Sequence, residues 1–377
     1  MLYLDNAATT LKKPASVYAS MIYNTLKNSV NAGHGGHYYS LRGAKGIYDA
    51  AEALSALLGI SNPERIAFTQ NATYALNMGI RGLVSENDHV VTTAMEHNSV
   101  LRTLHSLCNY TLTEADSRGY VRPDAIEAAI KPETKLIVVN HISNVSGTVQ
   151  NIKEIGRLAK KHNIPLMVDA AQSIGATDIN AEDMGIDMLA FSGHKGLMGP
   201  LGVGCLYVSD RIQLKPSFTG GTGSDSKNLN QPEVLPDMLQ PGTLNTPAII
   251  ACGSAARYIK KRGASAIGEE ETYLAVRFIE KIKNIINVNV YGNLSAQGRN
   301  STVAFNINGV DSVELAERLN KEYFICVRGG WHCAYPAHCA IGTEKTGAVR
   351  ASFGAFNTIH SADKLADAVY KISRECK

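Results

Sequence analysis

The sequence lacks the features that direct a chain to a membrane or to nucleic acid. No apolar stretch approaches the roughly 20 residues that a membrane-spanning helix needs. The 37 Lys and Arg residues nearly balance the 34 Asp and Glu residues, and no basic run is interleaved with aromatic residues. There are no internal repeats and no low-complexity segments. We therefore expect neither a membrane nor a nucleic acid among the partners.

The cysteines argue against a disulfide framework. Their number is odd, they form no Cys-x-x-Cys motif, and no signal-peptide pattern precedes the first predicted strand. This pattern is typical of a reduced, cytoplasmic chain. Most cysteines lie in apolar strings, which predicts inert core residues. The seven cysteines are at positions 108, 205, 252, 326, 333, 339 and 376.

What the sequence does contain is an alternation of apolar strands and amphipathic helices. With 377 residues, 45% of them hydrophobic, the chain can bury a large core, and we expect two domains. The pattern predicts an α/β fold with a mainly parallel sheet covered by helices. Residues 217–247 are predicted to form a loop and residues 247–262 a linking helix. The predicted strands are 65–69, 88–93, 135–140, 165–169, 188–192 and 203–208, and a further helix is predicted at 151–162.

Lys195 directly follows one of these strands, within Ser192-Gly193-His194-Lys195-Gly196. A lysine amine forms a Schiff base with an aldehyde only when it is unprotonated, and burial or a nearby cation lowers its pKa. Ser192 and His194 are suited to hold a phosphate beside that aldehyde. Taken alone, however, the motif would fit an ordinary surface lysine in a loop.

The strand at 165–169 ends in a carboxylate, Asp169. Active groups of open α/β sheets gather beyond the carboxyl ends of the strands, where both Asp169 and Lys195 would lie. A buried carboxylate needs a cationic partner, and a protonated pyridine nitrogen supplies one, while Gln172 could donate to a phenolate oxygen of the same ring. The alternative is that Asp169 is a helix N-cap. Together, the aspartate and the lysine predict a pyridoxal phosphate (PLP) site.

A phosphate-binding turn is predicted where the strand at 65–69 leads into the next helix. Asn71 is a suitable N-cap, so the backbone N–H groups of Ala72 and Thr73 would face an anion. By itself this pattern would indicate only a helix cap. With Ser192 and His194 it supports a phosphate site.

Eight motifs in a fixed order carry a wider resemblance. They are Leu4-Asp5-Asn6-Ala7-Ala8-Thr9-Thr10, Glu96-His97-Asn98-Ser99, His141-Ile142-Ser143-Asn144-Val145-Ser146-Gly147-Thr148, Val168-Asp169-Ala170-Ala171-Gln172-Ser173, Ser192-Gly193-His194-Lys195, Pro241-Gly242-Thr243, Arg328-Gly329-Gly330-Trp331-His332-Cys333-Ala334 and Arg350-Ala351-Ser352. Together they span nearly the whole chain. The chain resembles the cysteine desulfurases of the NifS/SufS-like family, which have the class-V aminotransferase fold.

The resemblance implies a PLP-dependent transferase of fold type I. Residues 15–250 would form the large PLP-binding domain. Residues 1–14 and 251–377 would form a small α+β domain that carries an acceptor-cysteine loop. The loop at 217–247 would cross to the partner of a homodimer.

The resemblance also implies how PLP would be held. Lys195 would form the Schiff base, Asp169 would pair with the pyridine nitrogen, Gln172 would bond the ring hydroxyl and His97 would stack on the ring. The imidazole of His97 can also move protons near neutral pH, although it could equally be a structural histidine.

Further residues are implied for the phosphate and the substrate. Thr73, Ser192 and His194 would bind the phosphate, helped by Thr243 of the partner subunit. Asn144 and Arg350 would hold the substrate carboxylate, a task that suits the forked guanidinium. His34 matches a loop on the substrate side.

Cys333 determines which reaction the resemblance implies. It follows a Gly-Gly turn and has His332 beside it, an accessible place for a thiolate nucleophile. L-Cysteine would be converted to L-alanine, with Lys195 removing the α-proton and Cys333 taking up sulfur as a persulfide. The persulfide would then pass to an acceptor protein or thiol. The short spacing before Cys333 resembles the group II, SufS-like branch.

Other functions remain open at this point. His332, Cys333, His338 and Cys339 are metal-ligand types, but their spacing matches no common zinc module, so we expect no metal. L-Selenocysteine is an alternative substrate, and an aminotransferase or a lyase that releases sulfide are alternative reactions. A non-catalytic partner in sulfur transfer would not need both Lys195 and Cys333. Trp331 and residues 334–349 depart from better-known members of the family, which bears on specificity.

Overall fold

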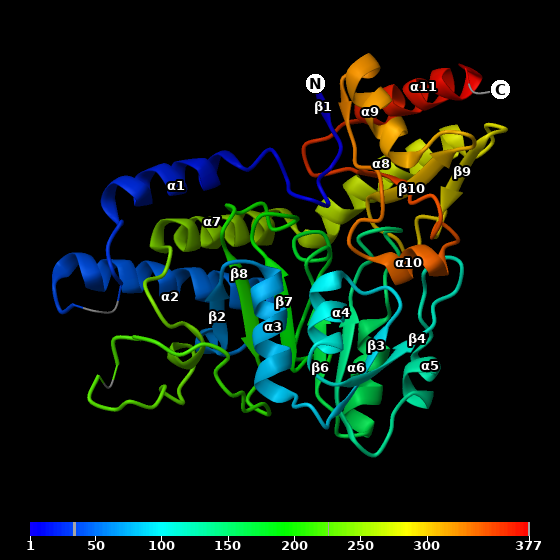
Figure 1. The fold of residues 1–377 in the computed structure, drawn as a ribbon. Helices are drawn as coiled ribbons and strands as arrows, with labels where there is room; N and C mark the ends of the chain where they lie inside the picture. The colour runs from blue at the N-terminus through cyan, green and yellow to red at the C-terminus, as the bar shows by residue number, and fades with distance from the viewer. Residues whose placement is uncertain (33–34, 225, 376–377) are drawn as a thin grey trace.

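A seven-stranded sheet forms the centre of the larger part of the molecule (Figure 1). The computed structural model describes residues 1–377 except 33–34, 225 and 376–377. β8 is antiparallel to both of its neighbours, and the other pairs are parallel, so six strands run in one direction. In spatial order the strands are β2 (Ile66–Thr69), β8 (Gly204–Val208), β7 (Met188–Ser192), β6 (Leu166–Asp169), β5 (Thr134–Asn140), β3 (His89–Thr93) and β4 (Asn109–Thr113).

The expected α/β fold with a mainly parallel sheet is confirmed, and each predicted strand is present to within one residue at either end. β4 was not predicted. It lies at the edge of the sheet, and its half-exposed residues give a weaker hydrophobic pattern than a central strand does.

Both faces of the sheet are buried. Val91, Ile137 and Val168 point into one hydrophobic cluster, whereas their neighbours Val90, Val138 and Met167 point into another. α3 (Ala72–Leu83) and α4 (Asn98–His105) cover the second face, and the longer α2 (Tyr38–Leu58) and α7 (Thr246–Arg262) cover the first (Figure 1). The remaining helices of this part are α1 (Ala15–Lys27), α5 (Pro123–Ala128) and α6 (Ile152–Lys161).

A third cluster forms the core of the smaller part, with Phe278 in edge-to-face contact with Phe305. The three-stranded antiparallel sheet β12-β10-β9 packs against helices there, and both chain termini lie beside it (Figure 1). Its elements are α8 (Ala264–Ile282), β9 (Val288–Tyr291), β10 (Thr302–Ile307), α9 (Ser312–Tyr323), β12 (Val349–Ser352) and α11 (Ile359–Glu375). The division into one domain of residues 15–250 and another of residues 1–14 and 251–377 stays a prediction. Side chains of α7 belong to the first hydrophobic cluster, and those of α8 belong to the third cluster from Leu274 onward.

Two short pieces complete the fold. β1 (Leu2–Tyr3) pairs in parallel with β11 (Ile325–Cys326), which brings the N-terminal segment to the smaller part. α10 (Tyr335–Ala340) follows Cys333 and packs its Ala337 into the first cluster, so this segment lies against the larger part. No helix in the described ranges is both long and apolar enough to cross a membrane.

Candidate functional site

The carboxyl ends of the parallel strands bring the predicted site residues together. β6 ends at Asp169, Lys195 follows β7, His97 follows β3 and Asn144 follows β5. Together with the first turn of α3, these segments enclose a pocket of about 250 Å³. Nine of the predicted site residues line it: Ala72, Thr73, His97, Asn144, Asp169, Gln172, Ser192, His194 and Lys195.

Burial changes the acid–base behaviour of the two central groups. It lowers the pKa of the Lys195 amine to about 8, an effect that the nearby Asp169 carboxylate opposes. Burial also raises the pKa of Asp169, whereas the Ala171 N–H, at 2.9 Å from Oδ1, and the Lys195 charge lower it. A lysine whose pKa is this low has a substantial neutral fraction at neutral pH, as attack on an aldehyde requires.

The turn before α3 has the predicted capping geometry. The Asn71 side chain accepts a hydrogen bond from the Tyr74 N–H at 3.1 Å, and the Ala72 N–H donates to Ser192 Oγ at 3.0 Å. A Cβ on Gly204 would lie 2.4 Å from the Asn71 carbonyl carbon, so only glycine lets β8 approach the turn this closely. The start of α3 and the loop after β7 therefore meet where an anion would bind.

His97 is held by the helix that it caps. Its Nδ1 accepts a hydrogen bond from the Ser99 N–H at 3.1 Å, which assigns the proton of the neutral imidazole to Nε2. Burial, and then the charges of Lys195 and Arg350, lower the pKa of His97 to about 4. The Ser99 hydroxyl also lies 2.8 Å from Thr73 Oγ1. Sequence reasoning had assigned no role to Ser99.

The N-terminal segment contacts the site in a way that the sequence did not predict. Thr10 Oγ1 donates to the Lys195 carbonyl at 2.8 Å, and Gln172 Nε2 donates to the Ala7 carbonyl at 2.9 Å. The segment was recognised as a motif, but nothing in its spacing placed it against a loop some 185 residues away.

Arg350 is only 2% exposed and does not itself line the pocket, but it contacts Asn144, which does. Its Nη2 pairs with Asp5 Oδ1 at 2.7 Å, and its Nη1 donates to the Asn144 carbonyl at 3.0 Å. Nε is buried and has no hydrogen-bond partner among the described residues. Nε therefore keeps an N–H for a substrate carboxylate, and each terminal nitrogen keeps a second N–H beyond the bond given above.

Cys333 is exposed and lines a groove that shares Thr73, His97 and Ser99 with the pocket. Both His332 and Cys333 have left-handed backbones, with φ of 49° and 57°, a conformation that costs about 1–2 kcal/mol per residue outside glycine. The Ala334 N–H closes this turn by donating to the Trp331 carbonyl at 3.0 Å. Two further hydrogen bonds hold it from other segments: the Asn98 N–H donates to the Cys333 carbonyl at 2.7 Å, and Asn144 Nδ2 donates to the His332 carbonyl at 2.8 Å.

The two histidines of this segment bond each other. His332 Nε2 lies 3.2 Å from the Arg328 carbonyl, which can only accept, so His332 Nδ1 accepts from His338 Nε2 at 3.2 Å. The Thr343 hydroxyl then donates to His338 Nδ1 at 2.7 Å. Burial keeps both rings neutral by lowering the pKa of His338 to about 4 and that of His332 to about 2. Within the described ranges, no three His, Cys, Asp or Glu side chains are grouped as metal ligands.

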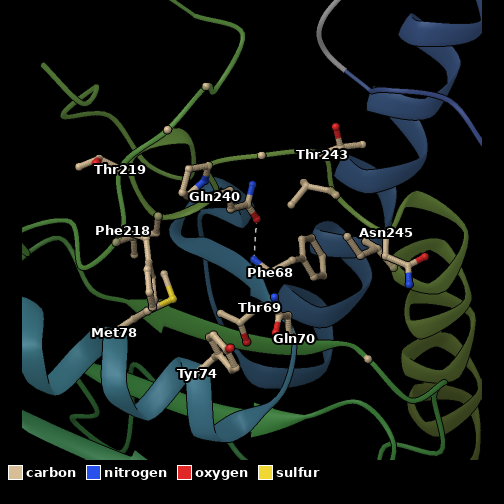
Figure 2. A pocket seen from close by; sticks show the side chains of 18 residues that line it. Phe68, Thr69, Gln70, Tyr74, Met78, Phe218, Thr219, Gln240, Thr243 and Asn245 are labelled. Carbon is tan, nitrogen blue, oxygen red and sulfur yellow. Dashed lines mark hydrogen bonds between the residues drawn. The ribbon is translucent and has the colours of Figure 1, made fainter. Parts of the chain in front are cut away.

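Thr243 does not line the Lys195 pocket. Thr243 lines a separate pocket of about 690 Å³, with Phe68, Tyr74 and Gln240 (Figure 2), which shares no lining residue with the Lys195 pocket. There the Phe68 N–H donates to Gln240 Oε1 at 2.5 Å (Figure 2). A contact with the phosphate of a partner subunit stays a prediction, and His34 lies outside the described residues.

Glu96 is a buried acid to which sequence reasoning gave no role. Its Oε1 accepts from Thr93 Oγ1 at 2.6 Å and from the Asn140 N–H at 2.8 Å, whereas Oε2 has no partner among the described residues. Burial raises its pKa to about 8, against the effect of these two hydrogen bonds. Its place in the Glu96-His97-Asn98-Ser99 motif was the only available signal.

The donor set of the pocket fits PLP. A partly neutral lysine amine suits an aldehyde, a buried carboxylate suits a pyridinium, and a helix start with adjacent hydroxyls suits a phosphate. Among the described residues, the Asp169 carboxylate accepts one hydrogen bond, from the Ala171 N–H, so it keeps acceptor capacity for a ring N–H.

Comparison with known proteins agrees with this geometry. The chain is 35% identical over 382 residues to the "Probable cysteine desulfurase" of Methanothermobacter thermautotrophicus, covering 99% of this chain and 94% of the relative. It is 30% identical to the "Cysteine desulfurase" of Haloferax volcanii, covering 98% and 88%. The apo structure of the cysteine desulfurase from Thermococcus onnurineus NA1 superposes with a TM-score of 0.91 at 31% identity, covering 99% and 95%. The model of the aminotransferase class-V family matches residues 2–365, and the chain belongs to this family.

Proposed function

We propose that this protein is a PLP-dependent cysteine desulfurase, which converts L-cysteine into L-alanine and captures the sulfur as a persulfide on Cys333. One observation carries the proposal: an exposed cysteine lines a groove that adjoins the buried lysine–aspartate pocket, and His97 lines both cavities. The names of the relatives support the same reaction.

PLP, when bound, supplies an electron sink for the carbanion that forms beside the substrate amine. Lys195 would hold it and would then move the α-proton, since burial keeps a fraction of its amine neutral. Asp169 would bind the ring nitrogen, and Gln172 the ring hydroxyl. Thr73, Ser192 and His194, with the backbone of Ala72, would bind the phosphate.

The substrate would be oriented by two residues that contact each other. Arg350 Nε would donate to the carboxylate of L-cysteine, and the free N–H of the Asn144 amide would add a second bond. His97 would hold a proton at Nε2 and exchange it with the substrate thiol or the product.

Sulfur transfer would complete the reaction. The Cys333 thiolate attacks the substrate sulfur while the bond from that sulfur to the β-carbon breaks. The β-carbon keeps the electron pair and takes a proton to become the methyl group of alanine, and Cys333 is left as a persulfide. No external oxidant or reductant is needed for this step.

We also propose that the protein works as a homodimer in which Thr243 reaches the partner's phosphate site. Thr243 lines the 690 Å³ pocket beside the turn before α3, next to the aromatic pair Tyr74 and Phe218. A sedimentation mass of twice 40.5 kDa would support the dimer, and a monomer active at assay concentration would contradict it.

Mass spectrometry after incubation with L-cysteine tests the reaction. We expect alanine in the medium and one extra sulfur on Cys333 in the PLP-loaded wild type. Cys333→Ala should lose both. Cys339→Ala, which removes the other exposed cysteine of the same segment, should keep both. Pyruvate with free sulfide would indicate a lyase, a keto acid an aminotransferase, and turnover of L-selenocysteine alone a selenocysteine lyase.

A further inference from the structure

A groove of about 380 Å³ leads away from the site between α3 and α4. Thr73, His97 and Ser99 line both this groove and the inner pocket, so the two cavities are continuous around these side chains. Cys333 lines only the groove, and the hydrogen bond from the Asn98 N–H fixes its backbone over the start of α4. A sulfur atom carried on Cys333 therefore faces the groove from the side of the pocket.

The groove is lined by positive charge without compensating negative charge. Arg81 of α3 and Arg102 of α4 lie along it, and no Asp or Glu is among its lining residues. Arg81 bonds only neutral side-chain atoms, Asn77 Oδ1 at 3.1 Å and Ser106 Oγ at 3.0 Å. Within the described part of the chain, neither arginine makes an ion pair. Their charge is therefore available to an anionic group.

Two exposed aromatic side chains each lie two residues from Cys333 along the chain, although neither lines the groove itself. Trp331 is 44% exposed and Tyr335 54% exposed, although Trp331 also donates to the Glu344 carbonyl at 3.0 Å. Tryptophan, tyrosine and arginine are the residues enriched where proteins bind one another, and exposed aromatic area is not needed for binding a small thiol. This combination indicates a protein rather than a metabolite.

We propose that this groove docks an acidic, cysteine-bearing segment of a sulfur-acceptor protein, held by Arg81 and Arg102, while the exposed Trp331 and Tyr335 of the Cys333 segment offer contact area to the rest of that protein. The proposal rests on the proposed role of Cys333 as the persulfide carrier. The acceptor thiolate attacks the outer sulfur of the persulfide, the bond between that sulfur and Cys333 Sγ breaks, and Cys333 leaves as a thiolate. The acceptor then carries the persulfide, and no net oxidation or reduction occurs.

The test uses two short synthetic peptides with one cysteine each. In one peptide the cysteine is flanked by Asp and Glu, and in the other by Asn and Gln. The PLP-loaded protein is first charged with L-cysteine, and the extra sulfur on Cys333 is quantified by mass spectrometry. Transfer to each peptide is then followed in a single turnover, and each rate is divided by the rate of transfer to dithiothreitol for the same variant.

We expect the acidic peptide to receive sulfur faster than the amide peptide. Arg102→Gln should lower that preference by about threefold to tenfold, as expected for one partly solvated ion pair, and adding Arg81→Gln should lower it further. Added salt should weaken the preference, because exposed charges are screened. Arg374→Gln, a change of an exposed arginine on α11, is the matched control and should leave the preference unchanged.

Three results would overturn the proposal: equal rates for the two peptides, a preference that Arg102→Gln does not alter, or mercaptosuccinate outcompeting the acidic peptide as acceptor. Failure of the proposed function would be seen separately, as the absence of extra sulfur on Cys333. In that case a binding measurement still tests whether the groove docks an acidic segment. Binding is measured by the fluorescence of Trp331, the only tryptophan, with the Cys333→Ser protein and an acidic peptide in which serine replaces cysteine. Adding Arg102→Gln should weaken this binding.

Discussion

The pocket around Lys195 and the turn at Cys333 lie side by side but are built in opposite ways. The pocket groups stand at the ends of buried strands, and burial lowers the pKa of Lys195 and raises that of Asp169. The Cys333 turn has two consecutive left-handed residues and an exposed thiol, and hydrogen bonds from Asn98 and Asn144 hold it. The comparison teaches that the proton-transfer groups depend on burial at the ends of strands, whereas the cysteine that carries the sulfur must be accessible from solvent.

The largest expected effect comes from removing the central group of the pocket. Lys195→Ala should lower alanine formation by at least about 10³-fold, because both covalent attachment and proton transfer are lost. In the wild type, attachment of PLP should become faster as the pH rises through about 8, where the amine loses its proton.

Lys13 offers a matched control for this substitution. Burial also lowers the pKa of its amine to about 8, but Lys13 donates to the His194 carbonyl and does not line the pocket. Lys13→Arg should therefore stay within about tenfold of the wild type, since the loss follows from the position of Lys195 and not from its pKa alone. If Lys195→Ala and Lys13→Arg lost alanine formation equally, the special role of a lysine inside the pocket would be contradicted.

Alkylation of the thiols compares the interior and the surface directly. Iodoacetamide near pH 8 should modify Cys333 and Cys339 at least about 10²-fold faster than Cys205 and Cys252, because the thiolate is the reactive form. Burial raises the pKa of Cys252 to about 12 and that of Cys205 well above its ordinary value. Peptide mapping would measure each rate, with urea-unfolded protein as the reference. Similar rates at all four positions in the folded protein would contradict the proposed contrast.

The smallest expected effect concerns stability beneath the pocket. The folded-state pKa of Glu96 is raised to about 8, so the folded protein binds this proton more tightly than the unfolded chain does. The resulting stabilisation is complete below about pH 4.5 and is lost as the pH rises through about 8. Glu96→Gln keeps the Oε1 acceptor and removes the titration.

Urea unfolding of the cofactor-free proteins would measure this contribution. Between about pH 6.5 and pH 9, the free energy of unfolding of the wild type should fall by about 2 kcal/mol more than that of Glu96→Gln. Cofactor-free protein is chosen because PLP binding itself depends on pH. Parallel pH profiles for the two proteins would show that Glu96 does not titrate in this range.

The sequence predicted best what depends on strand ends. Asp169 and Lys195 each follow an apolar strand, and parallel strands bring their carboxyl ends to one edge, so their proximity followed from the pattern alone. Contacts that depend on chain segments meeting across the fold could not be predicted in this way. The pairing of Asp5 with Arg350 and the chain of bonds from Thr343 through His338 to His332 have no periodic signal. Thr243 is a different case, because a second subunit is needed to test its predicted position.

The first ten residues connect the two parts of the molecule by contacts to both. Leu2 and Tyr3 pair with β11, and Asp5 pairs with Arg350, whereas Ala7 accepts from Gln172 and Thr10 holds the carbonyl of Lys195. A hinge motion that separated the smaller part from the large sheet would have to stretch or break these bonds. This short stretch of chain therefore couples the substrate-carboxylate side of the pocket to the lysine side, in addition to the bonds that Asn98 and Asn144 make to the Cys333 turn.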